Sequence, residues 1–245
     1  MEISTKKSLL NYEVGTKFEP LQIEMTIRPP LFLANPYLFF DGIISYLCLR
    51  EALGEDYWSL PTNNGVDISL LRLPLKQTGD IWHGSIGIMN NPVLKKNTIY
   101  KRFTDKETYH LNKKLQTGKI RTNAGYYKDF MINLPLIITD KMKFYCCGDK
   151  EHLTKLLGNL TNIGKKTSIG GGHIKEINIK STETDYSFYK DGYCLKPIPS
   201  NIDILPIQKG DKWKQCTYKP PYWDTTNTKL CRVPPNQLLG EPNNA

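Results

Sequence analysis

The sequence predicts an α+β protein built on one antiparallel sheet that carries two helices on the same face. Two segments, residues 17–54 and 140–182, each combine strand-like alternation of apolar and polar residues with a helix that has one apolar face. An irregular stretch between them, at about 60–135, is expected to add one strand to the sheet. The resulting order, β–α–β–β–α–β, is the split β–α–β or ferredoxin-like (RRM-like) plan.

The first unit begins with "LQIEMTI", in which apolar residues at 21, 23, 25 and 27 alternate with polar ones and predict a half-buried strand. Arg28-Pro29-Pro30 is expected to end it. The run "GIISYLCLREALG" then has apolar residues at 43, 44, 47 and 48, which is helical spacing. Asp41 is the expected N-cap of this helix, and Gly54 is its expected end.

The second unit begins with "DKMKFYCCG", where Met142, Phe144 and Cys146 alternate with less apolar residues and predict a one-sided strand. "KEHLTKLLGNL" follows and has leucines on one helical face. After a glycine-rich stretch, "HIKEINIK" predicts the last strand, with Ile177 and Ile179 on one face.

We expect three regions along the chain. Residues 1–16 are predicted to be a flexible tail, and residues 17–182 to form the main domain with its insertion at about 60–135. Within the insertion, "DISLLRLPLK" and "WHGSIGIMN" are interpreted as strands. Residues 183–245 have little periodicity and predict an irregular extension packed on the main domain, in which Tyr222 and Trp223 are expected to be buried, with base stacking as the alternative.

The bulk composition favours a polyanionic partner, because the 245 residues carry a formal net charge of +9. No segment approaches the ~20 consecutive apolar residues of a membrane span, and the N-terminus lacks a signal-peptide core, so a cytoplasmic location is expected. The six cysteines are expected to be reduced and mostly buried. No cofactor, metal or small-molecule substrate is expected.

The stretch "NIGKKTSIGGGHI" (Asn162–Ile174) has the composition of a phosphate-binding loop, since glycine allows close approach of backbone amides and lysine adds charge. It fits neither a P-loop nor a dinucleotide fingerprint, because both run from strand to helix and this stretch runs from a predicted helix to a strand. The phosphates of a nucleic-acid chain are therefore the expected ligand. The alternative is a tight connection with solvated lysines, although the entropic cost of three successive glycines suggests a close-packed partner.

Residues 95–121 account for most of the net positive charge of the chain, with nine Lys or Arg against Asp105 and Glu107. Tyr100, Phe103 and Tyr109 are interleaved with these cations. Such alternation suits single-stranded nucleic acid, because cations neutralise phosphates and rings stack on unpaired bases. The alternative is a solvated charged loop.

An alternative catalytic function involves His110, with Lys113 and Tyr46 as partners in metal-independent RNA cleavage. Histidine would transfer the proton, and lysine would stabilise the charged phosphorane. The other histidines have no triad or metal spacing. A purely structural interaction protein is a third interpretation.

Taken together, these features resemble the RAMP superfamily of CRISPR-associated RNA-binding proteins. "FDGIISYLCLREALG", "KPIP" at 196–199 and "PPYW" at 220–223 are most similar to the Cas-five-like small RAMP subunit of type IV systems. The resemblance covers about residues 20–235.

This resemblance implies a non-catalytic subunit of an antiviral or anti-plasmid complex. Such a subunit binds the 5′ handle of the crRNA, and its thumb-like insertion contacts the first of the Cas-seven-like backbone subunits. A large subunit is an additional candidate partner, the target nucleic acid lies nearby, and no membrane is involved. The residues expected to bind RNA are Gly164, Lys165, Lys166, Thr167, Ser168, Gly170, Gly171, Gly172 and His173 in the glycine-rich stretch, and Lys95, Lys96, Lys101, Arg102, Tyr109, His110, Lys113, Lys114, Lys119 and Arg121 in the insertion.

Overall fold

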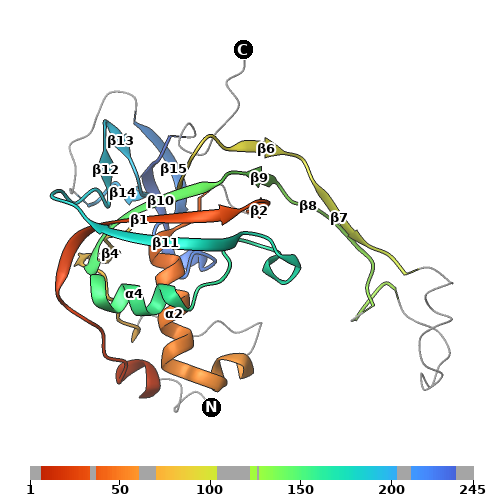
Figure 1. The fold of residues 1–245 in the computed structure, drawn as a ribbon, viewed down its shortest axis with the longest axis horizontal. Coiled ribbons are helices and arrows are strands. Elements are labelled where there is room, and N and C mark those ends of the chain that lie inside the picture. Colours follow the sequence, from red (N-terminus) through yellow and green to blue (C-terminus); the bar gives the residue numbers. More distant parts are fainter. Residues whose placement is uncertain are drawn as a thin grey trace.

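The computed structural model describes residues 7–33, 37–60, 70–103, 122–125, 127–202 and 211–235. It is a mixed α/β structure with mostly antiparallel sheets (Figure 1). Its main sheet has the strand order β11–β1–β10–β5, and helices α2 and α4 lie on the same face of it. The bounds are β1 Phe18–Arg28, α2 Phe40–Leu53, β5 Ile88–Met89, β10 Lys141–Asp149, α4 Lys150–Gly158 and β11 His173–Ser181.

The alternation predicted for the first strand is confirmed. Leu21, Ile23, Met25 and Ile27 of β1 are each at most 1% exposed, and they face the two helices. β1 is central, because it pairs antiparallel with both β10 and β11.

Strand β10 differs from the one-sided strand that the sequence predicts. Met142, Phe144 and Cys146 are completely buried, as expected. Tyr145 and Cys147, on the opposite face, are buried as well. The C-terminal extension contributes to this, since the ring of Tyr186 lies 5.5 Å from that of Tyr145.

Helix α2 is predicted correctly except for its start. Phe39, not Asp41, is the N-cap, and the helix ends where Gly54 adopts a positive φ of 53°. Asp41 is completely buried in the first turn and bonds to the C-terminal extension instead. The helix continues into the 3₁₀ helix η1 (Gly54–Ser59).

Part of the predicted flexible tail packs on the main domain. Leu9 is only 1% exposed, and the hydroxyl of Tyr12 donates to Glu51 at 2.7 Å. The amide of Gly15 donates to His152 in helix α4 at 3.0 Å. Residues 7–16 are therefore tied to both helices, contrary to the prediction.

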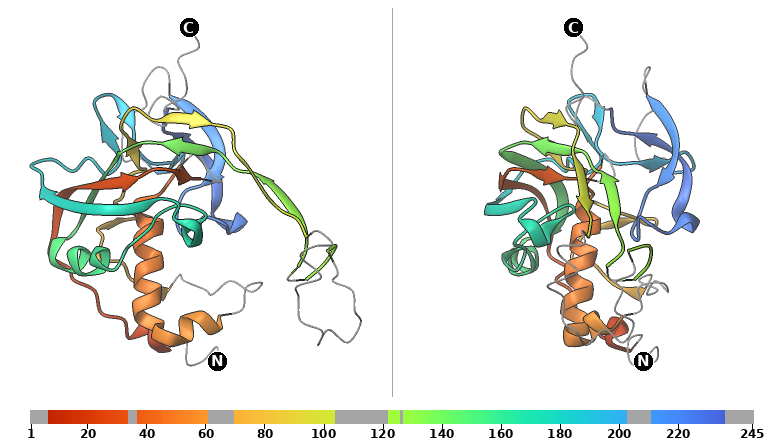
Figure 2. Two further views of the ribbon diagram at one scale, coloured as in Figure 1. Left: turned by 45° about the vertical axis from the view of Figure 1, so that its right-hand side comes forward. Right: turned by 90° about the vertical axis from the view of Figure 1, so that its right-hand side faces the viewer.

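The insertion contains a long two-stranded arm that projects from the sheet in Figure 1 and in the left view of Figure 2. We define the arm as residues 93–103 and 127–138. Its outer part pairs β7 (Thr98–Lys101) with β8 (Phe130–Asn133). At its base, β6 (Val93–Lys95) and β2 (Leu31–Phe32) both pair with β9 (Leu136–Ile138).

The strands predicted at 67–76 and 82–90 are much shorter in the structure. The described part of the first forms one isolated bridge, from Leu75 to Gly148, because Pro74 has no amide to donate. The segment 82–90 forms only the end of β4 (Ile81–Trp82) and the short strand β5. Between them, Gly84 and Ile86 each form an isolated bridge. β5 is the insertion strand expected to join the main sheet.

The C-terminal extension is more regular than predicted. β16 (Thr228–Val233) pairs with β14 (Ile198–Pro199) and β15 (Lys212–Thr217), and a hairpin joins β12 (Tyr189–Lys190) to β13 (Tyr193–Cys194). β4, which pairs with β3 (Gln77–Thr78), supplies Ile81 to a second hydrophobic core with the extension. All six cysteines are free, and five of them are buried. No helix in the described parts of the chain is long and apolar enough to cross a membrane.

A completely buried ion pair joins the extension to helix α2. The ammonium group of Lys196 lies 2.6 Å from the carboxylate of Asp41, and both side chains are 0% exposed. The hydroxyl of Tyr222 donates to the same carboxylate at 2.7 Å and lies 3.1 Å from the Lys196 nitrogen. Burial lowers the pKa of Lys196 although Asp41 opposes the shift, and burial beside Asp41 raises the pKa of Tyr222 well above its usual value.

We expect Lys196→Ala to lower the free energy of unfolding by ~3–5 kcal/mol, because it leaves the Asp41 carboxylate unpaired in the interior. Urea denaturation measures the change. Lys155→Ala is the control, since the Lys155–Glu51 pair has a 69% exposed lysine and its removal should cost at most ~1 kcal/mol. Equal destabilisation of the two variants would contradict a special role of the buried pair.

Candidate nucleic-acid interface

The glycine-rich loop (residues 159–172) leaves helix α4 and enters strand β11, as the sequence predicts. Its backbone is bound to the segment that follows β1. The amide of Lys165 donates to the carbonyl of Phe32 at 2.7 Å, and the amide of Gly172 donates to the carbonyl of Pro30 at 2.8 Å. The amide of Gly171 donates within the loop, to Lys166 at 3.1 Å. These amides are therefore engaged by the protein itself.

The same packing explains why the loop is rich in glycine. A Cβ atom on Gly172 would lie 1.9 Å from the carbonyl oxygen of Ile163, and one on Gly164 would lie 2.6 Å from that of Phe32. Both glycines also have positive φ, of 61° and 83°. The close-packed partner that the sequence suggests is thus the protein's own chain, and the glycines need no ligand to account for them.

Two of the predicted phosphate contacts, Gly171 and Gly172, are buried, so they are not placed for direct contact with a ligand. Of the other residues predicted to bind RNA here, Gly164, Lys165, Thr167, Ser168 and Gly170 are exposed, and so is His173, the first residue of β11. Lys166 is half-buried, with its ammonium nitrogen 5.3 Å from the centre of the Phe130 ring. The loop therefore contacts the outer part of the arm, through β8.

A cleft of about 690 Å³ lies between this loop and helix α2. We call it the loop cleft. Among the described residues, its lining includes four aromatic residues, one arginine and several amides and hydroxyls, but no acidic residue and no histidine. The polar and aromatic members are Tyr37, Phe39, Tyr46, Arg50, Asn159, Thr161, Asn162, Thr167, Ser168 and Tyr222.

Helix α2 supplies one wall of the loop cleft. Gly42, Tyr46 and Arg50 are four residues apart, so they lie on one face of the helix. Arg50 donates to the hydroxyl of Tyr46 at 3.1 Å, which orients both side chains. Gly42 leaves room for the ring of Tyr222, which would lie only 3.2 Å from a Cβ atom there.

The part of the loop cleft at the start of helix α2 depends on the buried ion pair described above. Lys196 and Asp41 hold the hydroxyl of Tyr222, and the Tyr222 ring stacks on Phe39 with centroids 3.8 Å apart and planes 7° apart. Tyr222 is therefore packed, as expected. Trp223 is not, since it is 67% exposed.

This arrangement suits an unpaired nucleotide. Aromatic rings stack on bases, the guanidinium group pairs with a phosphate, and amides and hydroxyls bond to base edges or ribose. A described lining without carboxylates lacks the main source of repulsion for phosphate. The volume lies within the ~300–1,000 Å³ typical of ligand pockets.

The structure brings only some of the predicted residues together. Gly164, Thr167 and Ser168 line the loop cleft with Tyr46, the alternative catalytic residue. Lys95, Lys96, Lys101 and Arg102 lie on the arm instead. The remaining predicted residues lie outside the described part of the chain: Tyr109, His110, Lys113, Lys114, Lys119 and Arg121.

Sequence reasoning missed Arg50, Asn159 and Asn162. The signal for Arg50 was present, because a tyrosine and an arginine four residues apart on an otherwise apolar helix mark a polar stripe. The two asparagines follow the end of helix α4, and no pattern in the sequence marked them.

The arm presents apolar side chains to solvent. Tyr100 and Met131 are directly opposite each other on β7 and β8 and are 73% and 72% exposed. Val93, Leu94 and Ile132 are also exposed. A two-stranded ribbon gains little stability on its own, so exposed apolar residues along it indicate a surface for a partner.

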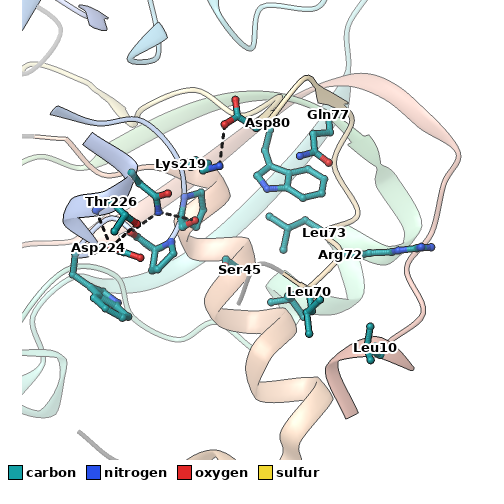
Figure 3. Close-up of a pocket in the computed structure, with 16 residues that line it drawn as sticks. Leu10, Ser45, Leu70, Arg72, Leu73, Gln77, Asp80, Lys219, Asp224 and Thr226 are labelled. Carbon is teal, nitrogen blue, oxygen red and sulfur yellow. Dashed lines mark hydrogen bonds and ion pairs between the residues drawn. The ribbon is translucent and has the colours of Figure 1, made fainter. Parts of the chain in front are cut away.

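A second cavity, of about 830 Å³, lies between helix α2 and the C-terminal extension (Figure 3). Leu70, Leu73 and Trp82 line one part of it, and Asp80 binds Lys219 at 2.9 Å on another. Trp223 also lines this cavity rather than the loop cleft. Its described lining carries two cations and two anions, which gives it no preference for a phosphate.

His83, for which the sequence shows no triad spacing, has two partners in the structure. It lies 2.7 Å from the hydroxyl of Thr78 and 2.7 Å from the carboxylate of Asp185. The ring packs against Phe188 at 4.5 Å. Because Asp185 and Phe188 belong to the extension, this cluster ties the extension to the β3–β4 hairpin.

We expect the stability cost of replacing a loop glycine to depend on whether that glycine is packed against the chain or surrounded by open space. Gly172→Ala should lower the free energy of unfolding by roughly 2–5 kcal/mol, through its clash with Ile163 and its positive φ. Gly170→Ala should cost ~1–2 kcal/mol, because only φ is unfavourable and the surrounding space is open.

Gly158→Ala is the control for this series. It has open space and no positive φ, so it should be neutral or stabilising by up to ~1 kcal/mol. Chemical denaturation of the three variants measures the order. A Gly172→Ala variant as stable as the Gly170→Ala variant would show that the loop does not pack as described.

Comparison with known proteins identifies the family. No protein of curated function matches the chain. A solved structure, described as the Type III-B Cmr-beta bound to cognate target RNA, contains a chain that is similar at 10% identity and a TM-score of 0.37. That similarity covers 73% of this chain and 65% of the other, so it spans less than two thirds of that chain. The family model of the CRISPR type IV associated protein Csf3 matches residues 19–234. The resemblance to type IV systems is thus confirmed, and the chain belongs to the family of CRISPR type IV associated protein Csf3.

Proposed function

We propose that this protein is the subunit of a type IV CRISPR effector complex that binds the 5′ handle of the crRNA without cleaving it. Membership of the family supports a subunit of a CRISPR complex. The observation that carries the RNA-binding role is the loop cleft, which combines aromatic walls and Arg50 with a described lining free of acidic residues. The net charge of +9 supports the same ligand.

The main domain follows the ferredoxin-like plan in this proposal. The sheet order β11–β1–β10–β5 supports it, with α2 between β1 and β5 in the chain and α4 between β10 and β11. This is the order in which the first and third strands of the split β–α–β unit are central.

RNA binding is divided between the loop and the loop cleft. The cleft takes an unpaired base of the handle, with Arg50 and the Thr167 and Ser168 hydroxyls at the sugar-phosphate. Lys165 is exposed on the loop and contacts the next phosphates of the RNA. The lysines of the arm contact the phosphates that follow. The glycines shape the loop and do not themselves grip the chain.

The proposed role is non-catalytic. Acid–base cleavage of RNA needs a proton acceptor at the 2′-hydroxyl, for which histidine is the usual residue. No histidine of the described ranges lines the loop cleft, and the hydroxyl of Tyr46 is bound by Arg50. The alternative, a metal-independent repeat endoribonuclease, needs His110 and Lys113, which lie outside the described residues.

The arm contacts the first backbone subunit in this proposal. The family resemblance implies that contact, and the exposed Tyr100 and Met131 give it an apolar surface. The lysines near the base of the arm remain available for RNA.

We expect the double variant Lys165→Ala/Lys166→Ala to bind handle RNA more weakly and with less salt dependence. Removing one phosphate contact lowers the slope of log K against log salt by ~0.7 for a single strand, so removing two lowers it by ~1.4. Fluorescence anisotropy at several salt concentrations, with a synthetic single-stranded RNA carrying the repeat-derived handle, measures the slope.

The matched control is Lys212→Ala/Lys214→Ala, which removes the same charge from exposed positions on β15. An unchanged slope in the loop variant, or an equal change in both variants, would rule out loop binding of the handle. The same RNA should remain uncut after incubation with the protein in EDTA. Products with a 2′,3′-cyclic phosphate would instead support the endoribonuclease.

We expect Tyr100→Ser/Met131→Ser to abolish co-purification with the Cas-seven-like subunit of the same locus. The reason is that both side chains project from an otherwise thin ribbon and supply its contact area. Leu10→Ser is the control, because Leu10 is 64% exposed but lies on the N-terminal helical turn. Retained co-purification of the arm variant would place the subunit contact elsewhere.

A further inference from the structure

We infer that the site takes two consecutive unpaired nucleotides, with the second base stacked on Trp58 at the end of helix α2. This inference rests on the proposed function, since it extends the loop cleft. Trp58 lies in η1, and its side chain is 68% exposed, although tryptophan gains most from burial.

The local geometry holds Trp58 in a fixed place. The guanidinium carbon of Arg50 lies 5.3 Å from the centre of the Trp58 ring and 5.6 Å from that of Tyr46. The ring of Tyr57 contacts both of these aromatic rings edge-on, at 5.2 Å from Trp58 and 5.8 Å from Tyr46. The indole is thus braced by Tyr57 and Arg50, and most of its surface is free for stacking.

Trp58 is continuous with the loop cleft. A smaller hollow of about 380 Å³ lies beside it, and Arg50 and Asn159 line both the hollow and the cleft. Trp58 and Gly54 line the hollow but not the cleft. A strand that leaves the cleft past Arg50 therefore reaches the Trp58 ring next. In Figure 1 and in the left view of Figure 2, η1 lies on the same side of the molecule as the glycine-rich loop and the arm.

Charge indicates which part of the nucleotide lies at Trp58. The hollow is also lined by Glu51 and Glu55, which repel phosphate. Glu51 is paired with Lys155 at 2.6 Å, but Glu55 is exposed. The sugar-phosphate therefore runs along the Arg50 and loop side, and the base, which has an aromatic face and carries no charge, occupies the Trp58 side.

Two positions of this kind select single-stranded RNA. A base stacked on Trp58 and a base inside the cleft are both removed from Watson–Crick pairing, so a duplex cannot occupy the site. Exposed tryptophan and arginine also anchor protein interfaces. Continuity with the loop cleft favours RNA here, and a protein contact is one outcome of the test below.

We test this inference with handle RNAs in which 2-aminopurine replaces one base at a time. Its fluorescence is expected to be quenched at two adjacent positions in the wild-type complex, and Trp58→Ala is expected to restore it at only one of them. Trp58→Ala should also weaken binding roughly five- to a hundred-fold, the effect of removing one stacked base. Trp58→Phe should retain most of the quenching, because it keeps a flat ring.

Trp223→Ala is the matched control, since Trp223 is exposed to almost the same extent, 67%, but lines the other cavity. Trp58→Ala could leave the affinity and all 2-aminopurine signals unchanged while Arg50→Ala weakens binding. That result would contradict base stacking on Trp58 and would still support RNA binding in the loop cleft. If wild-type protein binds no handle RNA, both proposals are overturned. If Trp58→Ala causes a protein subunit to dissociate and does not change RNA binding, base stacking on Trp58 is also contradicted, because Trp58 would then be a protein contact.

Discussion

The ion pair between Lys196 and Asp41 is the constraint on which the candidate site depends. Both charges are removed from water, and such a pair is tolerated only when its geometry is good and further hydrogen bonds satisfy it. Tyr222 provides that bond and is itself fixed by it. Because the Tyr222 ring stacks on Phe39 at the start of helix α2, a wall of the loop cleft is set by a contact between residues 155 positions apart.

The glycine-rich loop shows why a motif needs its structural context. Its composition is that of a phosphate loop, yet Gly164 and Gly172 are required by the carbonyl groups of Phe32 and Ile163. The amides of Lys165 and Gly172 donate to the carbonyls of Phe32 and Pro30, so they are not available to an anion. The proposed binding therefore rests on the exposed Lys165 and on the loop cleft, and the glycines contribute by shaping the loop.

Much of the main domain was predictable because its signals are local. The alternation in β1 and the leucine spacing in α4 reflect one buried face each, which a short window of sequence contains. The start of α2 was not predictable in the same way, because Asp41 is a good N-cap residue that a distant lysine recruits instead. The burial of Tyr145 likewise depends on Tyr186, which alternation within β10 does not reveal.

The C-terminal sheet and the candidate site escaped prediction for a related reason. The first four residues of β15 are exposed, so that strand lacks the alternation that identifies strands. The loop cleft combines residues from α2, the loop and the extension, and their proximity follows from tertiary packing. Only Tyr46 and Arg50 were adjacent in a helical pattern that the sequence displays.

The contact between the loop and the arm gives the two proposed binding activities a physical link. Lys166 lies over the ring of Phe130, and Phe130 pairs with Lys101 at the end of the β7–β8 pairing farther from the base of the arm. In the proposed arrangement, a phosphate at Lys165 and Lys166 lies close to the outer part of the arm, and a subunit on the arm lies close to the ring that Lys166 contacts. If binding at one place changes the affinity at the other, the reverse effect has the same factor, because linkage between two sites is reciprocal. Under the proposed function, the guide binds from Trp58 through the loop cleft to the loop, and the backbone subunit binds the arm, which the loop contacts at Phe130.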